Sequence, residues 1–214
     1  MLITDSMLAV ADIRKSSEAQ LWVAGCSVTH GVGVGPHERF GQLIADQLEL
    51  SVSFLTCPAS SLEWASDQIL RSDIRPGDTI VWGLTNIQRF AYYRDQQVDH
   101  VTVHYFQRNP GFDTVSLAEL DTENRFYQAI TSMDRVVNVC SKLDIKLVLA
   151  GVLIGVDYLP YLTKVPGYID LRSSMPQIVP KKFSLDVGTD GRHPGPITHR
   201  WYAEQILKQL NGSR

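Results

Sequence analysis

The sequence has no long apolar run and no large excess of charge of one sign. None of its apolar stretches approaches the roughly 18–20 consecutive residues that a membrane-spanning helix needs. The N-terminal residues 1–17 carry Asp5 and Asp12 and lack the apolar centre of a secretory signal. The formal net charge is −3, and no basic stripe is interleaved with aromatic residues. We therefore expect no membrane span and no nucleic-acid partner.

Cysteine is scarce as well. Only Cys26, Cys57 and Cys140 are present, and no two of them have the C-x-x-C spacing. Three cysteines without this spacing argue against a disulfide framework and against a zinc site, and they suit a reducing compartment. The sequence therefore predicts a cytoplasmic protein, and nothing in it implies a metal ion or an organic cofactor.

The glycine-rich stretch GVGVGP (31–36) does not have the spacing of a phosphate-binding loop. Pro36 occupies the place where the pattern G-x-G-x-x-G needs its last glycine, and the pattern G-x-x-x-x-G-K-[ST] is absent. The pattern G-x-S-x-G is absent too, which argues against the larger α/β-hydrolase class.

What is present is an alternation of apolar runs and helical patterns along 214 residues. This alternation predicts a three-layer α/β/α sandwich with a central parallel sheet, in a single domain over 1–214 with its core at 20–211 and an N-terminal extension at 1–19. We expect strands at 20–25, 51–57, 78–84 and 143–154 and helices at 38–50, 62–73, 123–143 and 196–210.

Two long stretches, 92–120 and 155–189, fall outside this alternation. Such excursions are often lids or binding loops, and the alternative is irregular structure on the surface. Tyr92 and Tyr93 can form a platform that stacks on a sugar ring. The alternative for them, as for the other aromatic residues Trp64, Trp82 and Phe90, is a place in the core or in the wall of a pocket.

Four short polar motifs follow the predicted strands or precede the last helix: AGCSVTHG (24–31), TCPASS (56–61), GLTN (83–86) and DGRHPG (190–195). Ligands of a doubly wound sheet bind where the carboxyl ends of the strands meet. Acyl transfer needs a nucleophile, a base, a group that orients the base, and donors for the oxyanion. Ser27, His193, Asp190 and the Asn86 amide can supply these in turn.

The ordered set resembles the SGNH hydrolases, also called the GDSL esterase/lipase family. Gly25-Cys26-Ser27 is similar to the Gly-Asp-Ser motif that carries the nucleophile. Gly83-Leu84-Thr85-Asn86 is similar to the motif with the oxyanion asparagine, with its glycine one place further away. Asp190-Gly191-Arg192-His193 is similar to the Asp-x-x-His motif of the orienting acid and the base. The resemblance covers residues 20 to 211.

Three positions depart from the family pattern. Cys26 stands where the family has aspartate. The oxyanion glycine after the second strand has no counterpart, so Ala59 or Ser60 would supply that amide, which is unstrained only where φ is negative. Ile87, not an aspartate, follows Asn86.

The resemblance implies a serine esterase that hydrolyses a small acyl ester of a small molecule or a carbohydrate. Among acyl groups, we expect O-acetyl to be the substrate. Ser27 would attack, His193 would act as base and Asp190 would orient it. The Ser27 amide, the Ala59 or Ser60 amide and Asn86 would hold the oxyanion.

Other interpretations remain open from the sequence. The same residues can serve an acyltransferase, or the fold can carry a disabled binding module. Cys26 can replace Ser27 as nucleophile. Ser27 and Asn86 can be ordinary turn or cap residues, Asp190 a turn residue and His193 a surface histidine before proline. A metal site at Asp190, His193 and His199 matches no strong ligand spacing, and His199 is expected to be structural or on the surface, as are His30, His37, His100 and His104.

Overall fold

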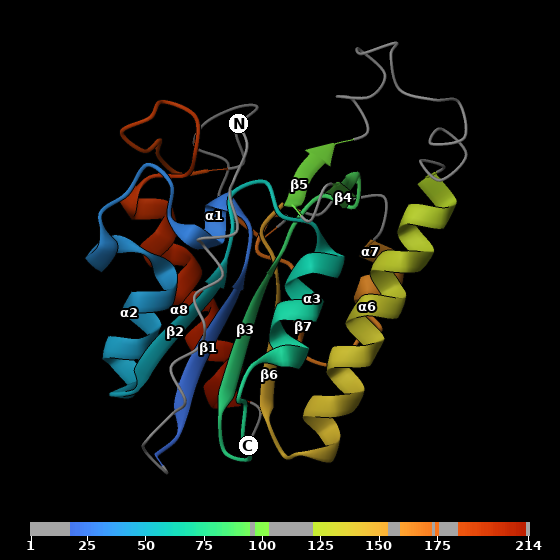
Figure 1. Cartoon of the computed structure of the whole chain (residues 1–214). Coiled ribbons are helices and arrows are strands. Elements are labelled where there is room, and N and C mark those ends of the chain that lie inside the picture. Colours follow the sequence, from blue (N-terminus) through green and yellow to red (C-terminus); the bar gives the residue numbers. More distant parts are fainter. Residues whose placement is uncertain are drawn as a thin grey trace.

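The structure is a computed structural model that describes residues 18–94, 97–102, 122–153, 159–172, 174–175 and 184–212. In this part of the chain a central sheet has helices on both faces (Figure 1). Its five strands are parallel and lie in the order β2-β1-β3-β6-β7, with bounds β1 Gln20–Gly25, β2 Ser51–Thr56, β3 Thr79–Leu84, β6 Lys146–Gly151 and β7 Tyr168–Ile169. The predicted three-layer architecture is confirmed.

The inner strands are apolar runs because both faces of the sheet are covered. Every residue of β1 and of β3 is buried, whereas the edge strand β2 is only partly buried. The four predicted strands are present, and β6 is shorter than the predicted segment 143–154. The short strand β7 is missing from the sequence-based prediction, because two half-buried residues give no periodic signal.

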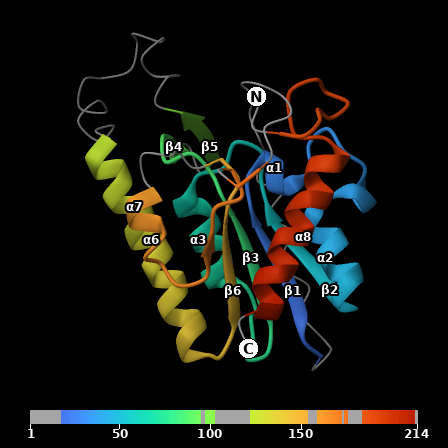
Figure 2. The same cartoon turned by 180° about the vertical axis from the view of Figure 1, so that it is seen from behind.

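Helices cover both faces of the sheet (Figures 1 and 2). On one face lie α2 (Phe40–Leu48), which follows the short 3-10 helix η2 (Pro36–Glu38), and α8 (Pro196–Gly212). On the other face lie α3 (Leu62–Arg71) and α6 (Thr122–Lys142). No helix of the described residues is long and apolar enough to cross a membrane.

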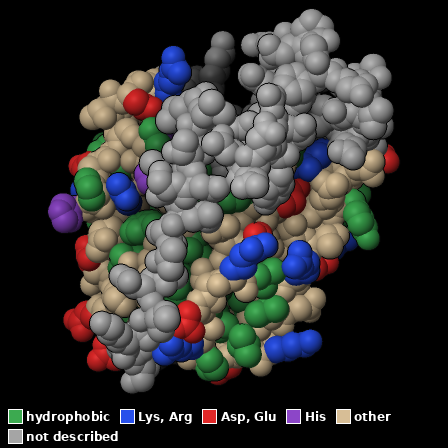
Figure 3. All heavy atoms as spheres, in the orientation of Figure 1, with side chains coloured by type: hydrophobic (Ala, Val, Ile, Leu, Met, Phe, Trp, Pro, Cys, Tyr) green, Lys and Arg blue, Asp and Glu red, His purple; other side chains and the backbone are tan. Residues whose placement is uncertain are grey.

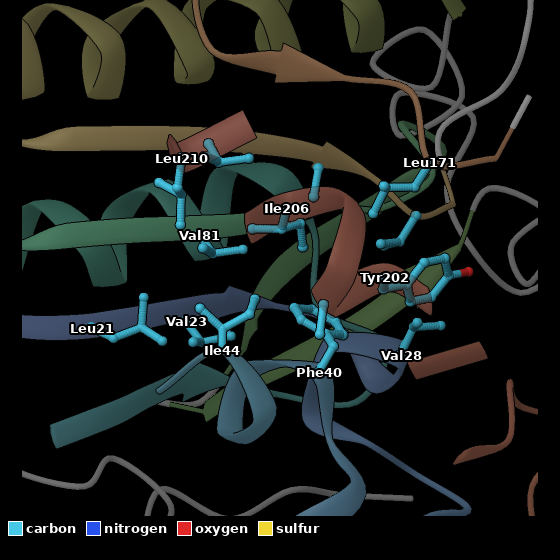
Figure 4. Packing of buried hydrophobic residues seen from close by; sticks show 14 of the residues in the cluster. Leu21, Val23, Val28, Phe40, Ile44, Val81, Leu171, Tyr202, Ile206 and Leu210 are labelled. Carbon is cyan, nitrogen blue, oxygen red and sulfur yellow. The ribbon is translucent and has the colours of Figure 1, made fainter. Parts of the chain in front are cut away.

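Each face has its own hydrophobic core. Between the sheet and α2 and α8, the β1 residues Leu21 and Val23 pack with Ile44 and Ile206, all four fully buried (Figure 4). The opposite core includes Trp82, as expected, at 0% exposure. Both faces of the inner strands are therefore packed against helices, which fixes the positions from which the loops at the carboxyl ends begin.

The stretch 92–120 contains a feature that the sequence does not predict. β4 (Arg89–Arg94) and β5 (Gln97–Thr102) form an antiparallel hairpin that branches from the carboxyl end of the sheet. The side chains of Tyr92, Tyr93 and His100 lie outside the described ones, and so does residue His104. The stretch 155–189 includes α7 (Leu159–Leu162) and β7.

At the amino end of the sheet, a buried carboxylate joins β1 to β3. Asp78, which is fully buried, accepts hydrogen bonds from the Gln20 N–H, the Trp22 indole N–H and the Arg75 N–H at 2.9–3.0 Å. At the opposite end, the chain leaves β1 toward β2 on one side and then returns to form β3 on the other. This switch point is where doubly wound sheets bind ligands.

The surface seen in Figure 3 carries basic and acidic side chains of the described residues intermixed, without a patch of one sign. This agrees with the small net charge of the sequence. Charge on this face therefore gives no argument for a polyanionic partner.

Candidate active site

Ser27 lies at the carboxyl end of β1, as predicted. It is the first residue of α1 (Ser27–His30), and Cys26 is the extended N-cap residue before it. Ser27 is 5% exposed, and its Oγ makes no hydrogen bond to another described residue. As the first residue of a helix, it has an N–H without an intrahelical acceptor. The hydroxyl and the N–H of one residue thus both remain available.

Two glycines allow α1 to pack directly on the strand ends. Gly25 has a φ of +144°, and a Cβ there would lie 2.5 Å from Thr29 Oγ1. A Cβ at Gly83, its partner in the register of β3, would lie 2.1 Å from the same oxygen. The glycine of the motif GLTN therefore leaves room for the Thr29 side chain of α1, and a Cβ at this position would force Thr29 to move.

Asp190 and His193 form a hydrogen-bonded pair, as their spacing predicts. His193 Nδ1 lies 2.5 Å from Asp190 Oδ2, and Asp190 Oδ1 accepts the N–H groups of Arg192 and His193 at 3.0 Å. The bond from the His193 side chain, followed by these backbone bonds, holds the pKa of Asp190 well below its usual range. An ionised carboxylate only accepts, so the proton lies on Nδ1 and the neutral ring presents Nε2 as a base.

The loop with this pair docks on the turn that follows α1. The Thr189 N–H donates to the Gly33 carbonyl at 2.8 Å, and a Cβ at Gly33 would lie 2.8 Å from Asp190 Oδ1. A Cβ at Gly188 would lie 2.6 Å from the Gly33 oxygen. Residues more than 150 positions apart are thus brought into contact at Gly33, six residues after Ser27. No hydrogen bond joins Ser27 to His193 in the described residues, and such bonds are often long in unliganded enzymes.

Asn86 lies at the carboxyl end of β3 and is exposed. Its Oδ1 accepts the Gln88 N–H at 2.9 Å, and its carbonyl accepts the Arg89 N–H at 3.1 Å. The Asx-turn considered as an alternative is therefore present. It does not exclude a donor role, because it occupies only the oxygen, and the Nδ2 amide has no acceptor among the described residues.

Ala59 and Ser60 differ sharply after β2. Ala59 has a φ of +67°, in the left-handed region that favours glycine. It therefore does not have the negative φ at which its amide would be unstrained. Its N–H has no acceptor among the described residues. The Ser60 N–H donates to the Cys57 carbonyl and its Oγ to the Gly25 carbonyl, each at 3.1 Å. Of the two amides, only that of Ala59 is free to bind a ligand.

The other candidate residues have structural surroundings. Cys26 is fully buried in the core beside Tyr202, which does not suit a nucleophile. His199 is also fully buried and accepts the Phe40 N–H through Nδ1 at 3.2 Å. His30 is partly buried against Thr56, and His37 is exposed. In the part of the chain that the structure describes, no three ligating side chains are grouped as a metal site.

Sequence reasoning missed Asp186, which anchors the loop of Asp190 and His193. Its carboxylate accepts the N–H groups of Ile197 and Thr198 at 2.9 and 2.8 Å, at the start of α8, and the Thr198 hydroxyl at 2.7 Å. Burial raises the pKa of Asp186, but these bonds outweigh it, and the net pKa is lowered. A carboxylate eleven residues before its partner is too distant for a capping pattern, so no sequence signal marks it.

No protein-family model matches the sequence, and no curated protein does. Solved structures match. The acetyl xylan esterase Est2A from the rumen bacterium Butyrivibrio proteoclasticus aligns at a TM-score of 0.57 and 10% identity, over 92% of this chain and 64% of its own. A carbohydrate esterase family 2 enzyme with a carbohydrate-binding domain, from Corynascus thermopiles (Myceliophthora fergusii), aligns at a TM-score of 0.50 and 14% identity. This alignment covers 94% of this chain and 69% of the enzyme. A protein from Slackia heliotrinireducens, provisionally named an SGNH hydrolase, aligns at a TM-score of 0.49 and 11% identity, over 90% of this chain and 100% of its own.

Because the sequence identities are low, these alignments support a shared fold and nothing beyond it. The alignments with the first two proteins extend over more than nine-tenths of this chain. The chain therefore has the three-layer fold of these esterases, the architecture expected from its resemblance to the SGNH hydrolases.

Proposed function

We propose that the protein is a serine esterase that hydrolyses a small acyl ester, with an O-acetyl group as its first substrate class. The observation that carries the proposal is the docking of the Asp190–His193 pair on the turn after Ser27. It is supported by the free N–H of Ala59 and the free amide of Asn86 at neighbouring strand ends, and by the shared fold with esterases.

In the first half of the reaction, Ser27 Oγ attacks the ester carbonyl and its proton passes to His193 Nε2. Asp190 keeps the ring in the required tautomer and stabilises the imidazolium. The tetrahedral oxyanion accepts hydrogen bonds from the Ser27 N–H, the Ala59 N–H and Asn86 Nδ2. The intermediate collapses when the C–O bond to the alcohol breaks and His193 returns the proton to the leaving oxygen.

In the second half, water attacks the acyl-enzyme. His193 takes a proton from the water, the second tetrahedral intermediate uses the same three donors, and the free acid leaves as Ser27 regains its proton. No step uses a metal or an organic cofactor.

The proposed alcohol part is a carbohydrate. Two proteins that share the fold are named for action on carbohydrate esters, one of them for acetyl xylan. An acyltransferase would use the same residues and pass the acyl group to an alcohol in place of water, so product analysis with added alcohols separates the two.

A disabled binding module is the second candidate function. The strained φ of Ala59 and the lack of a Ser27–His193 hydrogen bond among the described residues favour it. A module of this kind would bind an acetylated glycan without releasing acetate.

The test is a screen of acetyl, butyryl and octanoyl esters and of acetylated xylan, with released acid as the readout. We expect hydrolysis that is fastest for acetyl esters and that falls by a factor on the order of 10⁶ in Ser27→Ala. Ser66→Ala, which removes a buried hydroxyl between α3 and α6, is the matched control. Absence of hydrolysis by the wild type, or equal rates in Ser27→Ala, would contradict the proposal.

A further inference from the structure

Arg125 of α6 is a buried arginine that contacts two other elements, α3 and β4. It is 7% exposed, and its Nη2 donates to Glu63 Oε1 at 2.7 Å and to the Arg89 carbonyl at 2.5 Å. Its Nη1 donates to Gln128 at 2.5 Å, and the guanidinium lies 5.3 Å from the centre of the Phe90 ring. Burial lowers the pKa of Arg125, and Glu63 opposes this. Burial of a charged side chain such as Arg125 costs desolvation energy, so its contacts call for an explanation other than stability.

The partners of Arg125 lead to the two donors proposed for the oxyanion. Glu63 lies in the first turn of α3, whose N-cap residue Ser61 comes two residues after Ala59. Arg89 begins β4, and its N–H closes the turn on the Asn86 carbonyl. Arg125 therefore ties the element after Ala59 to the turn that holds Asn86, although it belongs to neither.

We propose that Arg125, paired with Glu63, is a positioning residue that fixes the Asn86 amide relative to the Ala59 N–H, a role that rests on the proposed function. The ion pair fixes the position of Arg89, where β4 begins, relative to the end of β3. The Asx-turn of Asn86 is built on that point, so the direction of Nδ2 depends on the Arg89 carbonyl that Arg125 holds.

The packing of α3 on α6 does not need this pair. Leu62, Ala65, Ala129 and Met133 are buried in the core between the two helices and the sheet. The Ser66 hydroxyl also donates to the Ser132 carbonyl at 3.1 Å. Arg125 adds a hydrogen bond from α6 to the Arg89 carbonyl at the start of β4, so its loss should change the turn at Asn86 more than the helix pair.

Two variants and one control test the proposal. Arg125→Lys keeps the charge, but its ammonium nitrogen lies one atom nearer the backbone than Nη2, which donates to both Glu63 and the Arg89 carbonyl, so we expect the variant to lose at least one of these two bonds. Glu63→Gln combined with Arg125→Met removes both charges and covers the case in which the lysine variant does not fold. Arg71→Met breaks the exposed pair of Arg71 and Asp67 on the same helix α3 and serves as the control.

The kinetic readout is the split between kcat and KM for an acetyl ester. We expect both test variants to lower kcat by about tenfold or more while KM stays within about twofold, because the oxyanion donors act in the transition state. Arg71→Met should change neither constant. In an Asn86→Ala background the Arg125 change should have little further effect. An unchanged kcat, or effects that add fully with Asn86→Ala, would overturn the proposal.

Hydrogen exchange tests the same claim without esterase activity. The N–H groups of Gln88 and Arg89 donate to the two oxygens of Asn86, so their protection reports on the turn. We expect this protection to fall by about tenfold or more in the folded test variants and to stay unchanged in Arg71→Met, with Val81 in β3 as the internal measure of folding. Unchanged protection at Gln88 and Arg89 would overturn the positioning role. An inactive wild type would overturn the proposed function, and exchange would still decide whether Arg125 holds Asn86.

Discussion

Ala59 is a single residue at which this chain departs from the SGNH-hydrolase pattern that it resembles. Three non-glycine residues of the described part have a positive φ: Glu49, Ala59 and Asp144. Glu49 is a helix C-cap, where the left-handed conformation is common, and aspartate tolerates it. Ala59 has neither reason. The proposed oxyanion role of the Ala59 N–H would account for this conformation, which a glycine at the same position would adopt without strain.

Ala59→Gly should therefore stabilise the fold and keep esterase activity. Relief of the left-handed strain, about 1–2 kcal/mol, exceeds the added entropy of glycine in the unfolded chain, about 0.5–1 kcal/mol. Urea unfolding should give a gain of about 0.5–1 kcal/mol. Ser60→Gly is the control, which should destabilise because it removes the bond to the Gly25 carbonyl. A less stable or inactive Ala59→Gly protein would show that the alanine is needed for another reason.

Asn86 has two roles that one substitution can separate. Asn86→Asp keeps an oxygen for the Gln88 N–H, so the turn should survive, but it replaces the Nδ2 donor with a negative oxygen. We expect a folded protein whose kcat is lower by a factor of about 10²–10³ or more. Circular dichroism and ester hydrolysis measure the two effects. Full activity in this variant would rule out Asn86 as an oxyanion donor.

At the scale of elements, Asp186 connects the start of α8 to the loop with Asp190 and His193. Asp186→Asn keeps one acceptor oxygen and replaces the other with an NH₂ group. This group cannot accept the hydrogen bond that Ile197 or Thr198 donates to the wild-type carboxylate. We expect a loss of about 1–3 kcal/mol in unfolding free energy, and a kcat lower by about tenfold or more, because the base loses its fixed position. Asp46→Asn, on the exposed side of α2, should change neither quantity. Equal behaviour of the two variants would remove Asp186 from the account.

The sequence predicts those elements whose signal is local. The strands at 20–25 and 78–84 are apolar runs, and the helices at 62–73 and 123–143 have a clear helical period, so each appears within a few residues of its predicted bounds. The Asp190–His193 pair is also local, since three residues separate its members.

What the sequence does not predict depends on contacts between distant segments. β7 exists because Tyr168 pairs with Leu149 of β6. The pair of buried Arg125 and partly exposed Glu63 joins residues 62 positions apart, and neither residue type marks a core position. The choice between Ala59 and Ser60 depends on φ, which a sequence does not reveal.

At the scale of the whole molecule, His199 links stability to pH. Its ring stacks on Phe40 at 5.7 Å and meets Tyr202 edge-on, between α2 and α8. Burial lowers the pKa of His199 from 6.5 to about 4, against the opposing charges of Asp186 and Glu38. Between these two values, the unfolded chain binds a proton that the folded chain does not, so stability falls as the pH falls from 6.5 toward 4.

The size of this effect can be measured by urea unfolding between pH 7.5 and 4.5. One unit of pKa difference is worth about 1.4 kcal/mol, so His199 alone should cost the wild type up to about 3 kcal/mol over the full range. His199→Asn keeps an acceptor for the Phe40 N–H, so it should be less stable at pH 7.5 but less sensitive to acid. An identical pH slope in both proteins would show that other groups cause the acid loss.

The central claim is that Ser27 is the nucleophile, activated by His193. The most direct measurement is labelling with a fluorophosphonate, followed by mass spectrometry of the peptide that contains residues 24–31. We predict one phosphonyl adduct, on Ser27, which is absent in Ser27→Ala and forms far more slowly in His193→Ala. An adduct that persists in Ser27→Ala and disappears in Cys26→Ala, or no adduct on the wild type, would contradict the account.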